Sequence, residues 1–434
     1  MKYYNLKDHL EKIDFREATI KGQGKEKGLF FPENIPHFDE ELIQNLHQYS
    51  NEEIAYRCMK DFAGDEIPSE ILKEIVAETV SFEIPLVKIN KHISILELFH
   101  GPTLAFKDIG ARFMSRCLSY FLKDRNKKVT VLVATSGDTG GAVAHGFYKI
   151  PQINVVILYP KNRVSPVQEK QLTALGENIS ALEVNGSFDD CQNLVKQAFS
   201  DEEVNSQLFL TSANSINVAR WLPQQIYYLI ALKQWMQEHK EQPVICVPSG
   251  NFGNICAGLL AHVRGLPANH FIAACNANHV IPDYFITQKY KPQKAIATLS
   301  NAMDVGDPSN FVRILELFGH QFEIVKNKIS AYSVDDEQTI NTIMEVYEKH
   351  GYILEPHSAV AFAAMEKYLK ENPEQKGFIL GTAHPVKFPD AVEKAIHGQI
   401  KIPESLKELM KKEKKTVEIN SDFEELRRFL LHKI

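Results

Sequence analysis

One lysine lies in an apolar loop that could prepare it for chemistry. Lys107 stands in GPTLAFKD (Gly101 to Asp108), after a Gly-Pro turn and directly behind Ala105 and Phe106. A lysine amine becomes a useful nucleophile when partial burial lowers its pKa, because burial disfavours the ammonium form. Such an amine can form an imine with an aldehyde. A loop lysine taken alone is more typical of a solvated surface, so its role depends on the other motifs.

A glycine-rich turn could bind a phosphate group. PSGNFGN (Pro248 to Asn254) follows the apolar run VICV and precedes the helical pattern NICAGLLAHV. Amides of such a turn, aided by the helix dipole, bind phosphate without a cationic side chain. A plain strand-to-helix turn would look similar, but neither GxxxxGK[ST] nor a strand-borne GxGxxG occurs to favour a nucleotide. The predicted phosphate cradle consists of Gly250, Asn251, Phe252, Gly253 and Asn254.

A second turn, ATSGDTG (Ala134 to Gly140), also ends an apolar run and opens a helical pattern. Its amides could hold a substrate carboxylate, together with the hydroxyl groups of Thr135, Ser136 and Thr139. The carboxylate of Asp138 has two interpretations. It could face the ring hydroxyl of a bound cofactor, or it could cap the helix, since Asp is a preferred N-cap residue.

Two further segments carry polar groups suited to ligand binding. In NSINVAR (Asn214 to Arg220), Asn214, Ser215, Asn217 and Arg220 lie near the start of a helical pattern that runs to Met236, and they could bind a second phosphate. Alternatively, Ser215 and Asn217 are only caps and Arg220 is a surface ion-pair partner. Thr382 follows the apolar run GFIL, where its hydroxyl could hydrogen-bond a pyridine nitrogen. A hydroxyl would leave that nitrogen largely neutral.

The composition excludes several classes of protein. The 434 residues carry a net charge of only -6, with basic residues spread along the chain, so no nucleic-acid footprint is visible. The apolar runs are shorter than the roughly 20 residues of a membrane span, and the N-terminus does not resemble a secretory signal. We therefore expect a cytoplasmic protein. Six cysteines without a CxxC pair predict buried thiols, and the absence of ligand spacing predicts no metal site.

Apolar runs alternate with amphipathic segments from about Ile93 onward, which predicts a doubly wound α/β architecture with parallel sheets. The first ninety residues have charged helical stretches and no Val/Ile-rich runs, which predicts a mostly helical domain. The expected units are an N-terminal domain (1–92), a small α/β domain with the lysine (101–215), a large cofactor-binding α/β domain (93–100 and 216–400) and a helical C-terminal tail (401–434).

Two more segments, taken together with the four motifs above, carry a resemblance to a known family. With SNAMDVGDPSN (Ser300 to Asn310) and LEPHSAVA (Leu354 to Ala361), the chain resembles the threonine synthase family from about Phe82 to Phe388. That family belongs to the fold type II pyridoxal phosphate enzymes, whose fold is tryptophan synthase β-like, and the first ninety residues fit its leading domain. The residues of the first segment themselves indicate only a loop.

The resemblance implies a function. It implies that the protein binds pyridoxal 5'-phosphate and converts O-phospho-L-homoserine and water into L-threonine and phosphate. Lys107 would be the Schiff-base lysine and would carry the Cα and Cβ protons. The cradle would bind the cofactor phosphate, and Thr382 would face the ring nitrogen. The implied substrate contacts are Arg220 and Asn214 for the phosphate, with Ser136 and Thr139 for the carboxylate.

Two alternatives stay open. A related phospho-lyase would carry nearly the same motifs but release 2-oxobutyrate, and a non-catalytic binding descendant would keep only the fold. The intact Lys107 and the intact cradle argue against the second. The expected partner is a small-molecule substrate, with no nucleic acid or membrane, and the protein is expected to be a monomer or homodimer.

Overall fold

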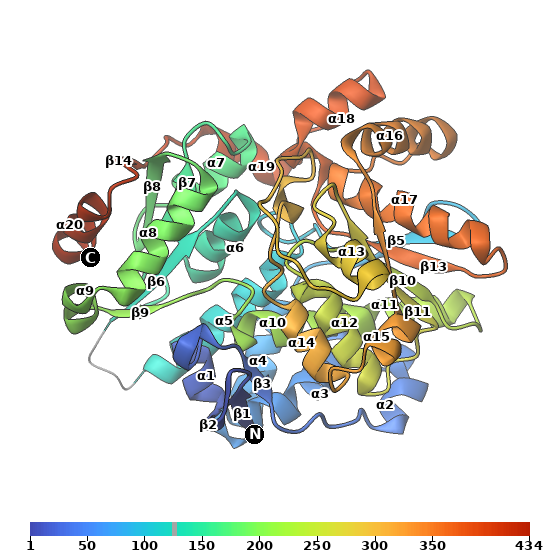
Figure 1. Cartoon of the computed structure of the whole chain (residues 1–434), viewed down its shortest axis with the longest axis horizontal. Helices are drawn as coiled ribbons and strands as arrows, with labels where there is room; N and C mark the ends of the chain where they lie inside the picture. The colour runs from blue at the N-terminus through green and yellow to red at the C-terminus, as the bar shows by residue number, and fades with distance from the viewer. Residues whose placement is uncertain (124–127) are drawn as a thin grey trace.

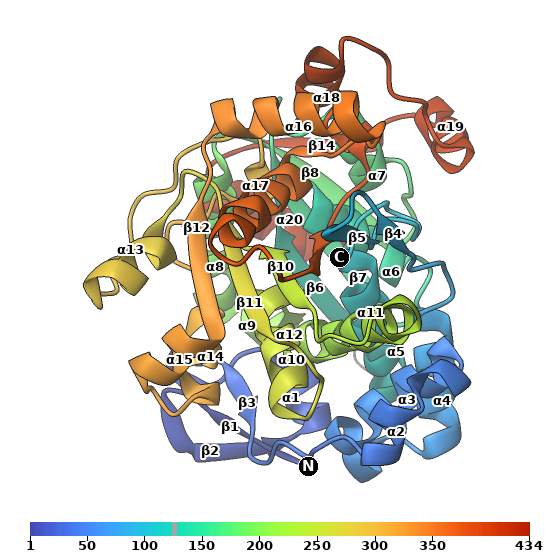
Figure 2. The same cartoon turned by 90° about the vertical axis from the view of Figure 1, so that its right-hand side faces the viewer.

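The computed structural model describes residues 1–123 and 128–434. Two α/β units, each built on one sheet, lie beside each other in Figure 1. The N-terminal segment lies beneath them in both views (Figures 1 and 2). This arrangement brings the ends of strands from both sheets toward one region between the units.

The larger sheet contains six strands in the order β12-β11-β10-β13-β5-β4, and only the pairing of the edge strand β4 is antiparallel. Its strands are β4 (Leu86–Lys88), β5 (Ile93–Glu97), β10 (Val244–Pro248), β11 (His270–Cys275), β12 (Ile329–Ser333) and β13 (Gly377–Gly381). Alternate residues of β10 are buried in different cores, Ile245 in one and Cys246 in the other. Helices therefore cover both faces of this sheet, as the continuously apolar runs predicted.

The helices of this unit are α10 (Val218–Trp221), α11 (Gln225–Glu238), α12 (Gly253–Val263), α13 (Val280–Thr287), α14 (Phe311–Leu317), α15 (Phe322–Lys328), α16 (Asp336–His350), α17 (Pro356–Glu371) and α18 (Pro389–Ile396). The helix α16 ends at Gly351, whose φ of 66° supplies the left-handed cap that the sequence predicted. The single long helix expected up to Met236 is wrong. A 3-10 turn, η4 (Leu222–Gln224), separates α10 from α11, because Pro223 has no N–H to continue the ladder.

The smaller sheet is entirely parallel, in the order β14-β8-β7-β6-β9. Its strands are β6 (Val129–Ala134), β7 (Ile153–Pro160), β8 (Ile179–Asn185), β9 (Phe209–Thr211) and β14 (Val417–Asn420), and its helices are α5 (Lys107–Leu122), α6 (Asp138–Phe147), α7 (Pro166–Thr173), α8 (Phe188–Ser200) and α9 (Glu202–Gln207). The doubly wound architecture predicted from the sequence is confirmed in both sheets.

The N-terminal segment is mostly helical, but it also contains a sheet that the sequence did not predict. Its helices are α1 (Phe15–Lys21), α2 (Glu40–Gln44), α3 (Asn51–Ala63) and α4 (Ser69–Thr79). The antiparallel sheet has the order β2-β1-β3, formed by β1 (Lys2–Asn5), β2 (Asp8–Asp14) and β3 (Phe30–Pro32). Because only one of the seven residues of β2 is buried, this strand lacks the apolar alternation that identifies a strand in a sequence.

The C-terminal segment is more than the helical tail expected from the sequence. It starts with α19 (Glu404–Lys411), whose Leu406 and Leu409 are buried, so this helix is not a fully solvated end. The strand β14 then pairs with β8, and α20 (Phe423–Lys433) packs against α8. The tail thus completes the edge of the smaller sheet, at the left of Figure 1.

All six cysteines are free and buried, as predicted. Burial raises the pKa of the Cys58 thiol to about 11, which keeps this thiol protonated and unreactive. No helix in the described ranges is long and apolar enough to cross a membrane.

Candidate active site

The site forms where the loop after β5 meets the end of β13. The backbone N–H of Phe106 donates to the carbonyl oxygen of Thr382 at 2.9 Å, and the N–H of His384 donates to that of Leu104 at 3.0 Å. The loop before Lys107 therefore lies antiparallel to the segment after β13. This pairing brings Lys107 and Thr382, which are far apart in the sequence, to one place.

Lys107 is the first residue of α5, and its side chain is 17% exposed. Its Nζ lies 3.9 Å from Asp138 Oδ2 and 4.6 Å from the ring centroid of Phe106. Burial lowers the pKa of Lys107, and the carboxylate of Asp138 opposes this shift only in part. The positive end of the α5 dipole acts in the same direction as burial. The environment therefore favours the neutral, nucleophilic amine that the sequence predicted.

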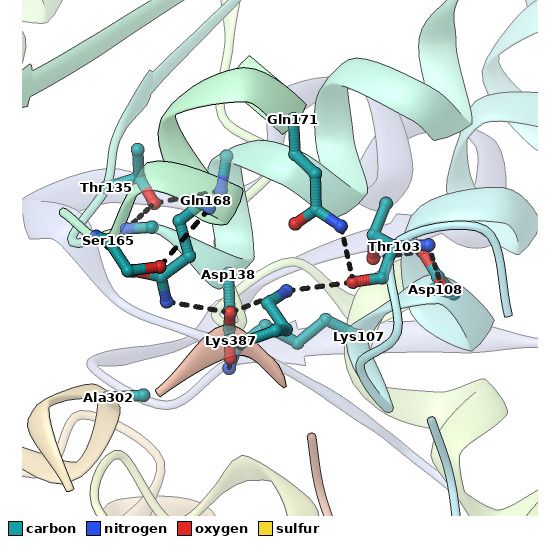
Figure 3. Close-up of polar contacts among 12 residues, drawn as sticks. Thr103, Lys107, Asp108, Thr135, Asp138, Ser165, Gln168, Gln171, Ala302 and Lys387 are labelled. Atoms are coloured by element: carbon teal, nitrogen blue, oxygen red, sulfur yellow. Dashed lines mark hydrogen bonds and ion pairs between the residues drawn. The ribbon is translucent and has the colours of Figure 1, made fainter. Parts of the chain in front are cut away.

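Asp138 does not cap its helix, so the N-cap interpretation is wrong. The N-cap residue of α6 is Gly137, and no side chain caps that end. The Asp138 carboxylate instead lies 2.7 Å from Lys387 Nζ and accepts a 3.0 Å hydrogen bond from Gln168 Nε2 (Figure 3). Burial raises the pKa of Asp138, but the ammonium groups of Lys387 and Lys107 outweigh burial and hold this pKa well below its usual range.

Lys387 is the site residue that the sequence did not reveal. It ends the short 3-10 turn η6 (Pro385–Lys387), and its side chain is fully buried. The signal that could have found it is a position five residues after Thr382, in the same segment GTAHPVK. A lysine in a short turn normally lies in solvent, so the sequence alone gave no reason to place it inside.

The predicted phosphate cradle has the geometry of an anion site. The first residues of α12 follow a turn in which Phe252, a buried aromatic residue, adopts a φ of 60°. Such left-handed backbone in a bulky residue is strained and persists only where the surroundings enforce it. Cys256 donates the first intrahelical bond, to Phe252, so the amides before Cys256 have no helical partner. A Cβ on Gly250 would lie 2.5 Å from Met303 Cα, so the turn leaves no room for a side chain.

The segment 300–310, which the sequence explained only as a loop, supports this cradle. Asn310 Nδ2 donates to the Asn251 carbonyl oxygen at 3.1 Å, and the Ser309 hydroxyl donates to Asn251 Oδ1 at 2.7 Å. At its other end, the Ala302 N–H donates to His357 Nε2 at 3.1 Å. The segment 300–310 therefore supports the backbone of the cradle through hydrogen bonds to Asn251.

Asn251 and Asn254 make different contacts. Asn251 Nδ2 donates to Ser215 Oγ at 2.6 Å, which joins the two segments predicted to bind phosphate groups. Asn254 Oδ1 accepts hydrogen bonds of 2.7 Å from the hydroxyls of Tyr227 and Tyr228 in α11. Asn254 Oδ1 therefore faces that helix, while its Nδ2 is buried without a partner in the described part of the chain, so both this amide group and the backbone N–H are available to a phosphate in the cradle.

The three hydroxyl groups of the ATSGDTG turn are of two kinds, one bonded within the turn and two without a hydrogen bond in the described part of the chain. Thr135 Oγ1 accepts the N–H groups of Gly137 at 3.0 Å and Gly140 at 2.9 Å, so this buried side chain shapes the turn. Ser136 and Thr139 are half-buried, and their hydroxyls make no hydrogen bond within the described residues. The second pair is therefore available to a substrate.

Arg220 is a buried cation that forms no ion pair with an acidic side chain among the described residues, although the charge of Asp108 acts on it from further away. Its side chain is 3% exposed, Nη1 donates to the Ala213 carbonyl oxygen, and Nε is buried without any partner in the described part of the chain. The surface ion-pair interpretation is therefore wrong. Burial lowers the pKa of Arg220 to about 10, which leaves it charged at neutral pH. A Cβ on Gly110 would lie 2.5 Å from the Arg220 carbonyl oxygen, so this glycine lets α10 approach the first turns of α5.

The other residues of NSINVAR have separate roles. Asn217 caps α10, with its side chain accepting the Ala219 N–H at 2.9 Å. Ser215 instead contacts Asn251, so the idea that Ser215 is only a cap is wrong. Asn214 is half-buried at the turn that leads to Arg220.

The fold and the site together define a class of protein. A partly buried lysine, a candidate phosphate cradle and a threonine whose backbone is bonded to the residue before the lysine fit pyridoxal phosphate, which needs an amine, an anion site and a ring partner. The family model described as "Pyridoxal-phosphate dependent enzyme" matches residues 83–380. The predicted fold type II class and the predicted cofactor are therefore confirmed. Among the described residues, no group of three His, Cys, Asp or Glu side chains could hold a metal ion.

The narrower family follows from two further family models and from a relative that matches over the full length. Models described as "Threonine synthase N terminus" and "Threonine synthase, C-terminal" match residues 2–80 and 358–430. The chain is 46% identical over 432 residues to threonine synthase of Escherichia coli (strain K12), with 100% of each chain covered. It belongs to the threonine synthase family and is a pyridoxal phosphate-dependent lyase.

Solved structures agree with this assignment. The crystal structure of threonine synthase from Escherichia coli matches with a TM-score of 0.93, at 45% identity and with 100% of both chains covered. The pyridoxal phosphate-bound threonine synthase from Brucella melitensis matches with a TM-score of 0.92, at 34% identity, over 100% of this chain and 99% of the other. Threonine deaminase from Solanum lycopersicum, at 15% identity and a TM-score of 0.57 over 76% of this chain and 92% of the other, shares the fold alone.

Proposed function

We propose that this protein converts O-phospho-L-homoserine and water into L-threonine and phosphate. The observation that carries the proposal is a second anion position beside the lysine. The amides of the cradle suit the cofactor phosphate, while the unpaired Nε of the buried Arg220 suits a different anion. A buried guanidinium without a carboxylate is unfavourable unless a ligand supplies the negative charge. A phosphorylated substrate supplies that charge.

The proposed roles follow from position and chemistry. When bound, pyridoxal phosphate withdraws electrons from the substrate and so acidifies its Cα and then its Cβ. Lys107, once released by the substrate, takes the proton from Cα and moves protons at Cβ, because burial lowers its pKa and so favours an amine that can act as a base. Arg220 and Asn214 hold the phosphate as it leaves Cγ. Ser136 and Thr139 hold the substrate carboxylate with the free amides of their turn.

Thr382 is assigned to the ring nitrogen of the cofactor. It lies directly after β13, and its backbone is tied to the residue before Lys107. A hydroxyl can share a hydrogen bond with a neutral pyridine nitrogen but cannot stabilise its protonated form as a carboxylate would. The ring therefore stays a moderate electron sink. The proposal also includes a small-molecule substrate, a cytoplasmic location and a monomeric or homodimeric state, as the sequence predicts.

The test is phosphate release from O-phospho-L-homoserine by the wild-type protein and by Lys107→Ala. The wild-type protein should have a near-visible absorbance band that borohydride reduction fixes onto Lys107, identified by peptide mass. Lys107→Ala should keep the fold, measured by circular dichroism, and lose turnover. A protein that gains no band on addition of pyridoxal phosphate, or a Lys107→Ala variant with wild-type turnover, would contradict the proposal.

A further inference from the structure

A buried ion pair lies next to the reactive lysine and has no assigned role. Asp138, from α6 in the smaller unit, meets Lys387, from η6 after the larger sheet, at 2.7 Å. The Asp138 side chain is 4% exposed and that of Lys387 is not exposed at all. Two charges are removed from water here, which is often no more stabilising than an apolar pair of the same size. The burial of Asp138 and Lys387 is therefore not explained by stability alone.

The contacts of Lys387 fix it in one position. Its ammonium group has three N–H donors. One points to Asp138 Oδ1 and another donates to the Thr103 carbonyl oxygen at 2.8 Å, in the loop that leads to Lys107 (Figure 3). The same carbonyl oxygen accepts a 2.9 Å bond from Gln171 Nε2. Lys387 therefore joins α6 to the lysine loop, and its charge cannot move away from the site.

The charges around Lys107 give the pair a function. Two acidic groups face it, Asp138 with Oδ2 at 3.9 Å and Glu355 further away, and two cations face it, Lys387 and Arg220. The Glu355 carboxylate is satisfied by the Ser358 hydroxyl and amide and by His357, so Asp138 is the closest acidic group that acts on Lys107. Without Lys387, the Asp138 carboxylate would hold the Lys107 nitrogen in its charged form.

We propose that Lys387 is a positioning residue that balances the charge of Asp138 and thereby sets the protonation state of the Lys107 nitrogen. The inference rests on the proposed role of Lys107 as the residue joined to the cofactor. It explains why an acid can stand so close to a lysine that must act as a base. It also predicts that the two members of the pair act on Lys107 in opposite directions, which a merely structural pair would not do.

The test uses the resting holoenzyme without substrate. The near-visible band of the cofactor joined to Lys107 is recorded against pH, and its midpoint is compared among variants. Lys387→Met should move the midpoint upward and Asp138→Asn should move it downward, each by about one pH unit or more, as expected for a charge within roughly 4 to 6 Å. The double variant should return toward the wild-type midpoint, and Lys387→Arg, which keeps the charge, should stay close to it.

A matched control and an independent label complete the experiment. Lys233→Met removes a half-buried lysine of α11 that donates to the Tyr49 carbonyl oxygen, outside the site, and it should leave the midpoint unchanged. Borohydride should label the Lys107 peptide in every variant, and a label elsewhere would refute the role of Lys107 and not that of Lys387. If Lys387→Met loses the cofactor, Asp138→Asn and Lys387→Arg decide the outcome. Midpoints that shift in the same direction, or that stay at the wild-type value, would overturn the inference.

Discussion

The backbone N–H of Phe106 donates to the carbonyl oxygen of Thr382 at 2.9 Å. This bond connects the loop that carries the reactive lysine to the strand end that carries the proposed ring partner. The two residues lie far apart in the sequence, so this bond holds the loop of Lys107 against the segment that follows β13. Substitutions of the Thr382 side chain can therefore test its chemistry while the backbone bond remains.

Thr382→Ala should weaken cofactor binding by about 0.5 to 1.5 kcal/mol, the net value of one hydrogen bond. The measurement is the dissociation constant of pyridoxal phosphate, from a titration of the near-visible band. Thr382→Asp should behave differently, because a carboxylate would hold a proton on the ring nitrogen and strengthen the electron sink. A changed spectrum or new side products are expected. If both variants match the wild-type protein, Thr382 does not face the ring.

Arg220→Met should separate function from stability. The substitution removes a buried cation that forms no ion pair within residues 1–123 and 128–434, so the free energy of unfolding in urea should change by no more than about 1 kcal/mol. The specificity constant kcat/KM for O-phospho-L-homoserine should fall roughly tenfold to a hundredfold or more, because a charge-assisted contact contributes about 1.5 to 3 kcal/mol. Inorganic phosphate should inhibit the wild-type protein competitively and the variant much less.

Arg264→Met is the matched control for Arg220. Its side chain is also fully buried, but it donates to Gln225 Oε1 and lies 3.3 Å from the Asp61 carboxylate. Removing one partner of such a network should cost about 3 to 5 kcal/mol of unfolding free energy. Full activity and unchanged phosphate inhibition in Arg220→Met would show that Arg220 has no role in substrate binding.

Asn310→Ala should weaken cofactor binding from outside the cradle. It removes the 3.1 Å bond to the Asn251 carbonyl oxygen and the 2.8 Å bond from Arg313. The dissociation constant of pyridoxal phosphate should rise by about fivefold to fiftyfold, equivalent to one or two hydrogen bonds. Asn5→Ala is the control, since Asn5 is equally buried and hydrogen-bonded but lies in the N-terminal sheet. It should lower stability and leave cofactor affinity intact. If both variants change the affinity for pyridoxal phosphate equally, Asn310 does not support the cradle.

The buried His145 predicts a loss of stability in acid. Burial lowers the pKa of His145 to about 4, and its Nε2 has no partner in the described part of the chain. The unfolded chain binds the proton near pH 6.5, so the stability present above that pH is lost as the pH falls from about 6.5 to 4. His145→Gln should lose less stability over this range, measured by urea midpoints at pH 7 and pH 5. Burial also lowers the pKa of His270 and His384 to about 4, so part of the loss should remain. An identical acid loss in the variant would contradict the burial argument.

The strands β6, β7, β8, β10, β11 and β13 could be predicted because burial on two faces leaves a direct trace in the sequence. The residues of β6 are all buried, and their run VTVLVA is almost entirely apolar. By contrast, β2 has one buried residue of seven and β14 has one buried residue of four, so neither shows an apolar pattern. Their pairing with β1 and β8 is a long-range choice that local composition does not encode.

The motifs of the candidate site could be found in the sequence where their signals are local, and the roles of their residues stay predictions. The turn at Gly250 and the loop of Lys107 each contain their own signals, glycines beside a strand and an apolar approach. Lys387 and the segment 300–310 carry no such signal. Their roles depend on contacts across the fold, those of Lys387 with Asp138 and those of the segment with Asn251. The N-cap interpretation of Asp138 was wrong for the same reason. The preference of Asp for N-cap positions favoured the cap, but the Asp138 carboxylate pairs with the ammonium group of Lys387, which is distant in the sequence.

The most direct measurement of the central claim is the product balance with O-phospho-L-homoserine. The holoenzyme is incubated with this substrate, and phosphate, threonine and 2-oxobutyrate are quantified together. The proposed reaction predicts one threonine for each phosphate and no 2-oxobutyrate, with both products absent in Lys107→Ala. Phosphate released together with 2-oxobutyrate, or no phosphate at all from a protein that carries its cofactor, would contradict it.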